Sequence, residues 1–561
     1  MSRRPPAGRI RLLLTVLVLG LGAIGARVST LHVRDAEAYE ALARDQRVRE
    51  VALPAARGSV FDRNGHELAI SLDARAIYAN PQAIERPGEV AGRIAPLIGA
   101  RRRQIARALD RETPFVYLAR RVDLAAAEKV EALGIPGIGL LEESKRYYPS
   151  GTLASQVLGF VGVDGDGLEG IELAYDRVLA GRPGTMVVEQ DPEGRPIPQG
   201  DARIREPVPG ESLVLTIDRD LQWQAQRALE RAVRQNGAKG GTVVVLDPST
   251  GDVLAMVTYP WFDANEYTEA PPEVLLNRAV TDVYEPGSVN KVITAAAALE
   301  DGAIGLGETI DVPGAYRVGD KVFRDIHPHG LEAMTLSDII AESSNVGTIR
   351  VAERLGRDRL AMWLTRFGFG RETGIDFPGE SEGILLDRDD WWVTSMGTIP
   401  MGQGIAVTPL QMASVYATVA SGGVKVRPRL VRGTIGAGER FEPAPPGHRR
   451  RVIGEDTARA VREMLVRVIE EGTGGLARVE GYEVGGKTGT ARKPLEGALG
   501  YSEEYVASFI GFAPADEPRI VVAAMLDEPD TVYGGVAAAP LFREVTRFAL
   551  ADLQVPPTEP G

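Results

Sequence analysis

The sequence predicts an α+β fold whose C-terminal half is built around one antiparallel β-sheet. Strand-like runs occur at both ends of this half, whereas residues 276–470 are rich in helical and loop patterns. The strand-like runs are 241–246, 253–257, 483–492, 505–512 and 519–526. The first two flank the turn sequence DPSTGD at 247–252, which predicts a hairpin. Strands at both ends of a domain favour a single sheet in which this hairpin pairs with the late strands.

Length and composition limit the remaining possibilities. A chain of 561 residues is too long for one ordinary core, so two or three domains are expected. The net charge of -13 argues against a nucleic-acid-binding protein, because no basic excess is available to displace counterions from phosphates. The chain contains no cysteine, which excludes disulfides, a thiolate nucleophile and cysteine metal ligands.

The N-terminus predicts a membrane anchor. The apolar run 12–26 follows four arginines, Arg3, Arg4, Arg9 and Arg11. As a helix it reaches only about 22 Å, and extension through Val33 gives about 33 Å if the Arg27 side chain reaches the outer interface. A cleaved signal peptide is the alternative, although AIGA at 23–26 is a poor match to a cleavage site. We therefore predict a cytoplasmic tail and uncleaved inner-membrane helix at 1–34, with everything after it periplasmic.

A first α+β domain is predicted at 45–205. Strand-like pieces such as 76–78 and 185–188 alternate there with charged helical stretches such as 125–133, and Gly and Pro are frequent. The sequence PVPG at 207–210 then predicts a domain boundary.

The second domain is predicted at 212–555. A strand at 212–217 and a helix at about 219–235 precede the hairpin described above. A helical pattern at 539–553 closes the domain. The Pro-rich tail at 556–561 is expected to be disordered.

The sharpest candidate for catalysis is the sequence YEPGSVNK at 284–291. An Ala-rich stretch follows it, which is a good helix former, so Ser288 and Lys291 lie one turn apart on the same helix face. The amides at a helix start favour developing negative charge. A lysine amine can activate a serine hydroxyl if desolvation or a neighbouring cation lowers its pKa. The alternative interpretation is an N-cap serine followed by a solvated lysine.

Two further clusters support the catalytic interpretation. A helix predicted at 337–349 carries Ser343 and Asn345, and its alternative interpretation is a polar kink. The sequence GGKTGT at 485–490 lies in a strand-like run, and its alternative interpretation is a Gly-rich turn. An edge strand with glycine can lie close to a peptide substrate and hydrogen-bond it. The three clusters, in this order, form a specific constellation.

These motifs resemble those of class B penicillin-binding proteins, and more closely the division-type peptidoglycan D,D-transpeptidases. The resemblance extends over nearly the whole chain. It includes RGSVFDRNG at 57–65, GLEGIE at 167–172, MGQG at 401–404 and ASFIGFAP at 507–514. One departure is Asn290, where family members commonly carry an apolar residue.

The resemblance implies a penicillin-binding-protein/β-lactamase-like transpeptidase domain, with a five-stranded antiparallel sheet and helices on both faces. An elongated α+β pedestal domain of the dimerisation type and one N-terminal transmembrane helix would precede it. It also implies septal peptidoglycan cross-linking. The implied ligands and partners are peptidoglycan stem peptides, β-lactams as covalent inhibitors, a membrane glycosyltransferase and other division proteins. No metal or other cofactor is implied.

The resemblance also implies roles for individual residues. Ser288 would attack the carbonyl of the penultimate D-alanine and expel the terminal D-alanine. Lys291 would act as the general base, and Ser343 would relay a proton to the leaving amine. Asn345 would bond the substrate amide or Lys291.

The strand motif would complete the site. Lys487 would supply positive charge that helps to keep Lys291 neutral. Thr488 and Thr490 would contact the substrate carboxylate on either side of Gly489. The amides of Ser288 and Thr490 would form the oxyanion hole.

Two alternatives to an active transpeptidase remain: a relative of the same fold that hydrolyses or senses β-lactams or is a catalytically inactive binding module, and a P-loop NTPase from a different class. A β-lactam-hydrolysing or β-lactam-sensing relative of the same fold would need a water-activating base near the acyl-ester for hydrolysis. A P-loop NTPase would fit the spacing of GYEVGGKT at 481–488 and the acidic pair Asp527 and Glu528 after a strand. However, a P-loop requires a strand before it and a helix after it, and Pro494 disfavours that helix.

Histidines and tryptophans contribute weaker signals. His327 and His329 lie in a His-Pro-His loop without a third ligand at helical spacing, so no metal site is expected. Trp391 and Trp392 could line a substrate groove, although the preferred interpretation is that they cover the edge of a core.

Overall fold

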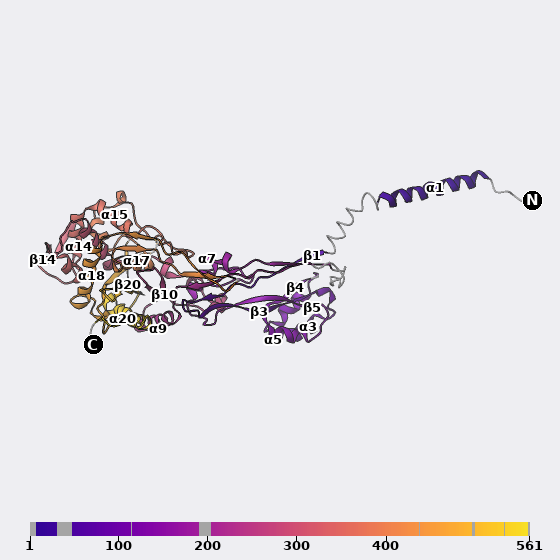
Figure 1. Cartoon of the computed structure of the whole chain (residues 1–561), viewed down its shortest axis with the longest axis horizontal. Helices are drawn as coiled ribbons and strands as arrows, with labels where there is room; N and C mark the ends of the chain where they lie inside the picture. Colours follow the sequence, from indigo (N-terminus) through magenta and orange to yellow (C-terminus); the bar gives the residue numbers. More distant parts are fainter. Residues whose placement is uncertain are drawn as a thin grey trace, which may run out of the picture. The chain divides into compact units, whose positions relative to one another are not determined.

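The computed structural model of the chain forms two compact units, one of residues 1–56 with 182–208 and one of residues 57–181 with 209–561 (Figure 1). The structure describes residues 7–30, 48–113, 115–189, 203–436, 438–495, 497, 500–531 and 533–558. Parts of all four predicted segments therefore lie outside the described residues: 1–6 and 31–34 of the tail and anchor, 45–47, 114 and 190–202 of the first domain, 437, 496, 498–499 and 532 of the second domain, and 559–561 of the disordered tail.

The first unit contains one long helix and one small sheet. Helix α1 (Ala7–Ser29) begins five residues before the predicted apolar run and, among the described residues, is the one helix long and apolar enough to cross a membrane. At 1.5 Å per residue it spans about 34 Å, which matches the hydrocarbon core of a bilayer. The sheet is antiparallel, in the order β1 (Val48–Leu53), β6 (Gly184–Glu189), β7 (Arg203–Arg205).

The second unit begins with a subdomain around the long strand β3 (Glu67–Ala79). Strands β4 (Val116–Asp123) and β5 (Ile138–Tyr147) pair with β3. Helices α3 (Pro87–Ile94) and α5 (Leu124–Glu131) lie in the same region of Figure 1, and α4 (Arg102–Leu109) contacts α3. Fully buried side chains from the sheet and the helices, Ile77, Ile94 and Ile105, form the core of this subdomain.

The sheet of β3 continues into the C-terminal part of the chain. Strand β2 (Val60–Phe61) pairs with β3 and, in parallel, with β8 (Ser212–Leu215). Strand β8 pairs with β16 (Val431–Ile435), which pairs with β17 (Phe441–Pro443). The predicted boundary at 207–210 is thus followed immediately by a strand that pairs with the earlier part of the chain.

The two first-domain sequence motifs meet in a buried ion cluster. Glu172, of which 1% is exposed, pairs with Nε of Arg57 and Nε of Arg146, both at 2.6 Å. Arg57 also pairs with Asp176 at 2.7 Å. Removing one partner from such a cluster leaves a buried charge uncompensated. The motifs at 57–65 and 167–172 are therefore joined by a buried ion pair between Arg57 and Glu172.

The main sheet has five antiparallel strands in the order β10-β9-β21-β20-β19. Their bounds are β9 (Gly240–Leu246), β10 (Val253–Tyr259), β19 (Gly485–Pro494), β20 (Tyr501–Ala513) and β21 (Ile520–Asp527). Val244 lies opposite Ala523, so the early hairpin pairs with a late strand. The predicted single antiparallel sheet is confirmed.

Helices cover both faces of this sheet (Figure 1). Helices α9 (Arg219–Gln235) and α20 (Ala539–Asp552) pack on the face that carries Val522 and Ala524. Helices α12 (Lys291–Glu300), α17 (Pro409–Ala420) and α18 (Glu455–Glu470) pack on the face that carries Val521 and Ala523. Because successive strand residues point to opposite faces, a strand covered on both sides is expected to be continuously apolar, as residues 520–526 of β21 are.

Further helices and three two-stranded pairs complete the described part of the second unit. The helices are α13 (Leu336–Ala341), α14 (Asn345–Leu355), α15 (Arg357–Phe367) and the short α6 (Ser155–Leu158), α7 (Gly170–Ala174), α8 (Asp176–Leu179), α10 (Pro272–Leu275), α11 (Arg278–Thr281), α16 (Ser395–Thr398) and α19 (Gly534–Ala537). The two-stranded pairs are β11 (Thr309–Pro313) with β14 (Leu331–Thr335), β12 (Ala315–Val318) with β13 (Lys321–Arg324), and β15 (Val424–Val426) with β18 (Arg449–Arg451).

The single helix predicted at 337–349 is wrong, because it breaks into α13 and α14. Ser343 adopts a φ of 60°, which is incompatible with a right-handed helix. Ser344 then caps α14 by accepting a hydrogen bond from the amide of Gly347. At the C-terminus, the amide of Thr558 donates to the carbonyl of Gly481, so the described part of the predicted disordered tail is held against the domain.

Candidate active site

Ser288 lies in a short 3₁₀ turn, η5 (Gly287–Asn290), that leads directly into α12. The motif at 401–404 holds this turn in place, because the amide of Gly287 donates a hydrogen bond to the carbonyl of Gly402 at 3.0 Å. A Cβ atom at Gly402 would lie 2.2 Å from the carbonyl oxygen of Gly287, so only glycine fits there. Ser288 itself is half-buried, and its hydroxyl has no hydrogen-bonding partner among the described residues.

The Lys291 side chain is fully buried, and its amine donates hydrogen bonds to three oxygen atoms. Its Nζ donates to the carbonyl of Ser343 at 2.6 Å, to Oδ1 of Asn345 at 2.8 Å and to Oγ of Ser343 at 3.3 Å. Burial lowers the pKa of Lys291 to about 7, and the negative charge of Asp325 opposes this shift. The predicted residues 291, 343 and 345 are therefore brought into direct contact.

Lys487 and Gly489 lie on β19, the edge strand of the main sheet. The Lys487 side chain is buried, and burial followed by repulsion from Lys291 holds its pKa well below the usual value. A Cβ atom at Gly489 would lie 3.1 Å from the carbonyl of Pro286, so glycine allows the Ser288 turn to lie against the strand. The strand motif and the Ser288 turn are thus neighbours.

The two threonines of the strand motif have different surroundings. Oγ1 of Thr488 lies 3.0 Å from Oγ1 of Thr473 and accepts from Lys487 Nζ at 3.4 Å. Oγ1 of Thr490 accepts a hydrogen bond from the amide of Gly534 at 3.1 Å. The hydroxyl hydrogen of Thr490 is therefore available to donate to a ligand.

Asn290 is accommodated although the family commonly has an apolar residue there. Its side chain is fully buried, and Nδ2 donates to the carbonyl of Ile399 at 2.9 Å. Oδ1 has no partner among the described residues. This hydrogen bond joins the Ser288 turn to the segment that contains Ile399, and Lys291 keeps its contacts with Ser343 and Asn345.

Sequence reasoning did not find Asp325 or the role of its neighbour His329. Asp325 accepts from the hydroxyl of Ser344 at 2.6 Å and from the amide of Val346 at 2.9 Å. His329 contacts Asp325 through Nε2 at 2.9 Å. The His-Pro-His pattern at 327–329 indicated only a possible metal site. Asp325, four residues before His329, was the signal that was missed.

Glu285 was also missed, although it lies only two residues before the Ser288 turn at 287–290. Its Oε1 accepts from the amide of Gly404 at 2.8 Å and from the hydroxyl of Tyr501 at 3.0 Å. Burial raises the pKa of this carboxyl above its usual value. Its second oxygen, Oε2, is buried and has no hydrogen-bonding partner among the described residues.

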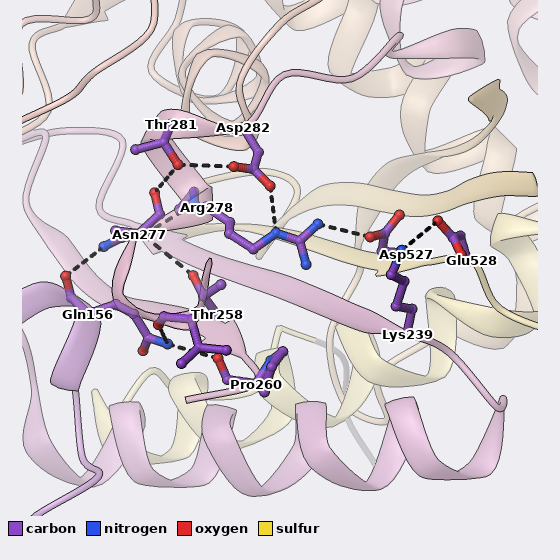
Figure 2. Close-up of polar contacts among 12 residues, drawn as sticks. Gln156, Lys239, Thr258, Pro260, Asn277, Arg278, Thr281, Asp282, Asp527 and Glu528 are labelled. Carbon is purple, nitrogen blue, oxygen red and sulfur yellow. Dashed lines mark hydrogen bonds and ion pairs between the residues drawn. The ribbon is translucent and has the colours of Figure 1, made fainter. Parts of the chain in front are cut away.

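The structure excludes the P-loop alternative. Lys487 and Thr488 lie inside a strand, whereas a P-loop requires them at the start of a helix. The acidic pair is also occupied by ion pairs (Figure 2). Arg278 pairs with Asp282 at 2.5 Å and with Asp527 at 2.9 Å, and Glu528 pairs with Lys239 at 3.4 Å.

The two tryptophans have different environments. Trp391 is 5% exposed and donates from Nε1 to the carbonyl of Leu386, in agreement with the preferred interpretation that it covers a core edge. Trp392 is 77% exposed, which differs from that interpretation because its ring lies on the surface.

Comparisons with known proteins agree with this fold. The family description "Penicillin binding protein transpeptidase domain" matches residues 241–547, and "Penicillin-binding Protein dimerisation domain" matches residues 52–215. The chain therefore belongs to the penicillin-binding proteins that combine a transpeptidase domain with a dimerisation domain.

Three individual proteins show how similar the chain is to named penicillin-binding proteins and transpeptidases. The chain is 37% identical over 546 residues to Penicillin-binding protein PbpB of Mycolicibacterium smegmatis, covering 90% of this chain and 84% of the relative. It is 34% identical over 568 residues to peptidoglycan D,D-transpeptidase FtsI of Escherichia coli, covering 98% and 92%. The crystal structure of Penicillin binding protein 3 from Mycobacterium tuberculosis complexed with aztreonam has a TM-score of 0.72, 32% identity and coverage of 91% and 99%. Together with helix α1, these relatives support a single-pass membrane protein.

Proposed function

We propose that this protein is a peptidoglycan D,D-transpeptidase that forms septal cross-links through an acyl-enzyme on Ser288. The observation that carries the proposal is the buried amine of Lys291, held by Ser343 and Asn345 one helical turn after Ser288, with a pKa of about 7. Relatives named as D,D-transpeptidases support the reaction class.

The first half-reaction forms the acyl-enzyme. Oγ of Ser288 attacks the carbonyl carbon of the penultimate D-alanine while its proton passes to Nζ of Lys291. The C–N bond to the terminal D-alanine then breaks, and the leaving amine receives a proton through the hydroxyl of Ser343. The products are an ester on Ser288 and free D-alanine.

The second half-reaction transfers the peptide. An amine of a neighbouring stem peptide attacks the ester carbonyl and loses a proton to the basic groups of the site. The new amide bond is the cross-link, and Ser288 regains its hydroxyl.

Lys487 acts on the substrate carboxylate and on Lys291. Burial of both amines, and repulsion of Lys487 by Lys291, disfavour the state in which both carry a proton. The carboxylate of the terminal D-alanine, bound beside Thr488 and Thr490, would stabilise the proton on Lys487. Lys291 would then remain neutral and act as the base.

The oxyanion of the tetrahedral intermediate would be bound by the amides of Ser288 and Thr490. The close approach of Gly287 to the carbonyl of Thr490 supports this assignment, since a Cβ atom at Gly287 would lie only 2.9 Å from that oxygen. Each such donor lowers the barrier by about 3 kcal/mol.

The organisation of the whole chain follows the same proposal. Residues 1–34 would comprise the cytoplasmic tail and anchor, 45–205 the pedestal, 212–555 the periplasmic transpeptidase domain and 556–561 the tail. β-Lactams would acylate Ser288. A membrane glycosyltransferase and other division proteins would bind the anchor and pedestal. Glycines 20, 22 and 25 of α1 have open space around them, which permits close helix packing.

Labelling with a fluorescent penicillin tests the proposal. We expect a covalent band on the full-length protein that persists for hours, and no band on Ser288→Ala. Ser249→Ala, at an exposed turn between β9 and β10, is the control and should label normally. Equal labelling of Ser288→Ala would refute the assignment, and release of the label within minutes would favour the hydrolytic alternative.

A further inference from the structure

The loop after β13 places a buried carboxylate directly behind the serine and asparagine motif. The Asp325 side chain is 8% exposed. Its Oδ1 accepts from the amides of Asn345 and Val346, and its Oδ2 accepts from the hydroxyl of Ser344 at 2.6 Å. His329 approaches the same Oδ2 with its Nε2 at 2.9 Å. The Asp325 carboxylate therefore accepts hydrogen bonds from four groups: two backbone amides, one hydroxyl and one imidazole.

His329 is bound in a way that favours its charged form. Nε2 faces Asp325, and Nδ1 faces the carbonyl of Gly330 at 2.9 Å. Both partners are acceptors, and only the imidazolium can donate from both nitrogens at once. The hydrogen bond to Asp325 accordingly raises the pKa of His329, and Glu332, 3.9 Å from Nδ1, adds to this effect.

These contacts hold a segment that does not adopt a regular helix. Ser343 has a φ of 60° in the break between α13 and α14. The first amides of α14 need acceptors, and Asp325 supplies them for Asn345 and Val346 while Ser344 supplies one for Gly347. A left-handed non-glycine residue persists only where its surroundings hold it. Asp325 provides that hold from outside the segment.

The same segment provides the acceptors of Lys291. Asn345 is attached to Asp325 through its backbone amide and to Lys291 through Oδ1. The carbonyl of Ser343, at the strained residue, is the nearest acceptor of Nζ. Displacement of the segment therefore displaces the hydrogen bonds that orient the amine.

We propose that Asp325 and His329 are positioning residues that hold the 343–345 segment against Lys291 and thereby orient the base that activates Ser288. This inference rests on the function proposed above. The charged groups that face Lys291 are Asp325 and Lys487. Those that face His329 are Asp325 and Glu332.

The charge of Asp325 affects how the acylation rate depends on pH, which a purely structural residue would not do. The negative charge of Asp325 raises the pKa of Lys291 against the effect of burial. In Asp325→Asn this charge is lost, so Lys291 stays neutral to lower pH, and the acid limb of the rate profile moves to lower pH. The maximal rate falls as well, because an amide cannot accept from Ser344 and His329 as the carboxylate does.

The test is the rate of acylation of the full-length protein by a fluorescent penicillin, measured from about pH 5.5 to 9. We expect Asp325→Asn to lower the maximal rate about tenfold or more and to shift the acid limb downwards. The matched control is Asp218→Asn. Asp218 is also a buried aspartate that accepts from two amides at a helix start, and its helix α9 packs on the opposite face of the main sheet. This control should lose thermal stability but keep the wild-type rate and pH profile.

A second pair of variants covers the case in which Asp325→Asn does not fold. His329→Ala should lower the acylation rate about threefold at neutral pH, since one hydrogen bond to the carboxylate is removed. His329→Gln can still donate to Asp325 and should restore most of the rate.

The outcomes separate this inference from the proposed function. The inference is overturned if Asp325→Asn, or in its absence His329→Ala, matches wild type in rate and pH profile, or if Asp218→Asn causes the same loss. In either case Ser288 would still be labelled and the proposed function would stand. Labelling that persists in both Ser288→Ala and Lys291→Met would instead remove the proposed function itself.

Discussion

At the scale of single residues, the environment of Lys291 decides whether its amine can act as a base. A lysine in water is protonated at neutral pH, and a protonated amine cannot take the proton of Ser288. Burial brings the pKa of Lys291 to about 7 despite the opposing charge of Asp325. The three surrounding oxygens orient the amine without adding a full ion pair.

A pH dependence follows from this residue. The neutral amine is the active form, so the acylation rate should rise as pH increases through about 7 and reach a plateau above it. Stopped-flow acylation by a penicillin whose own charge is constant in this range measures the profile. Lys291→Met, which cannot take a proton, should lose acylation at every pH. A flat wild-type profile across this range would contradict the role of Lys291.

At the scale of elements, the 3₁₀ turn η5 depends on contact with the 401–404 loop. Gly402 and Gly404 both have left-handed backbones, with φ of 80° and 79°. They differ in their surroundings, because a Cβ atom at Gly402 would meet the carbonyl of Gly287 at 2.2 Å whereas one at Gly404 would meet nothing closer than 3.6 Å. An alanine at either position would strain the backbone, but only an alanine at Gly402 would also displace the Ser288 turn.

We expect Gly402→Ala to lower the acylation rate about a hundredfold, because the added methyl displaces the Ser288 turn. Gly404→Ala imposes the same backbone strain without the contact, so it should lose a similar amount of thermal stability and retain most of the rate. Acylation kinetics and melting temperatures of both variants give the comparison. Equal rates in the two variants would show that the Gly402 contact does not position Ser288.

At the scale of the whole molecule, helix α1 differs from the rest of the described chain in its hydropathy and in its exposure. Its apolar window has a mean hydropathy of 2.0, and none of it is buried within the protein. The second unit has its own large cores on both faces of the main sheet. A unit with its own core is expected to fold without the anchor.

Removal of residues 1–30 should therefore release the protein from membranes and leave its penicillin acylation rate within about twofold of the full-length value. Fractionation of cells followed by labelling of both fractions measures the two properties together. Loss of labelling in a soluble, folded truncated protein would mean that the anchor contributes to the site.

Local sequence patterns were sufficient for several features of this protein. Alternating and continuous apolar runs predicted the strands of the main sheet and the pairing of the early hairpin with the late strands, because burial of a strand depends on its own side chains. The spacing of Ser288 and Lys291 predicted a shared helical turn, since three residues span most of one turn.

Tertiary structure alone decided the features that depend on contacts between distant segments. The break at Ser343 follows from Asp325, which reaches Ser344 across 19 positions, and Lys291 meets Asn345 across 54. A helical pattern at 337–349 could not reveal this break, because the acceptor that stabilises it lies in another loop. Sequence periodicity reports which side chains become buried, whereas the identity of their neighbours is set by how the chain folds back on itself.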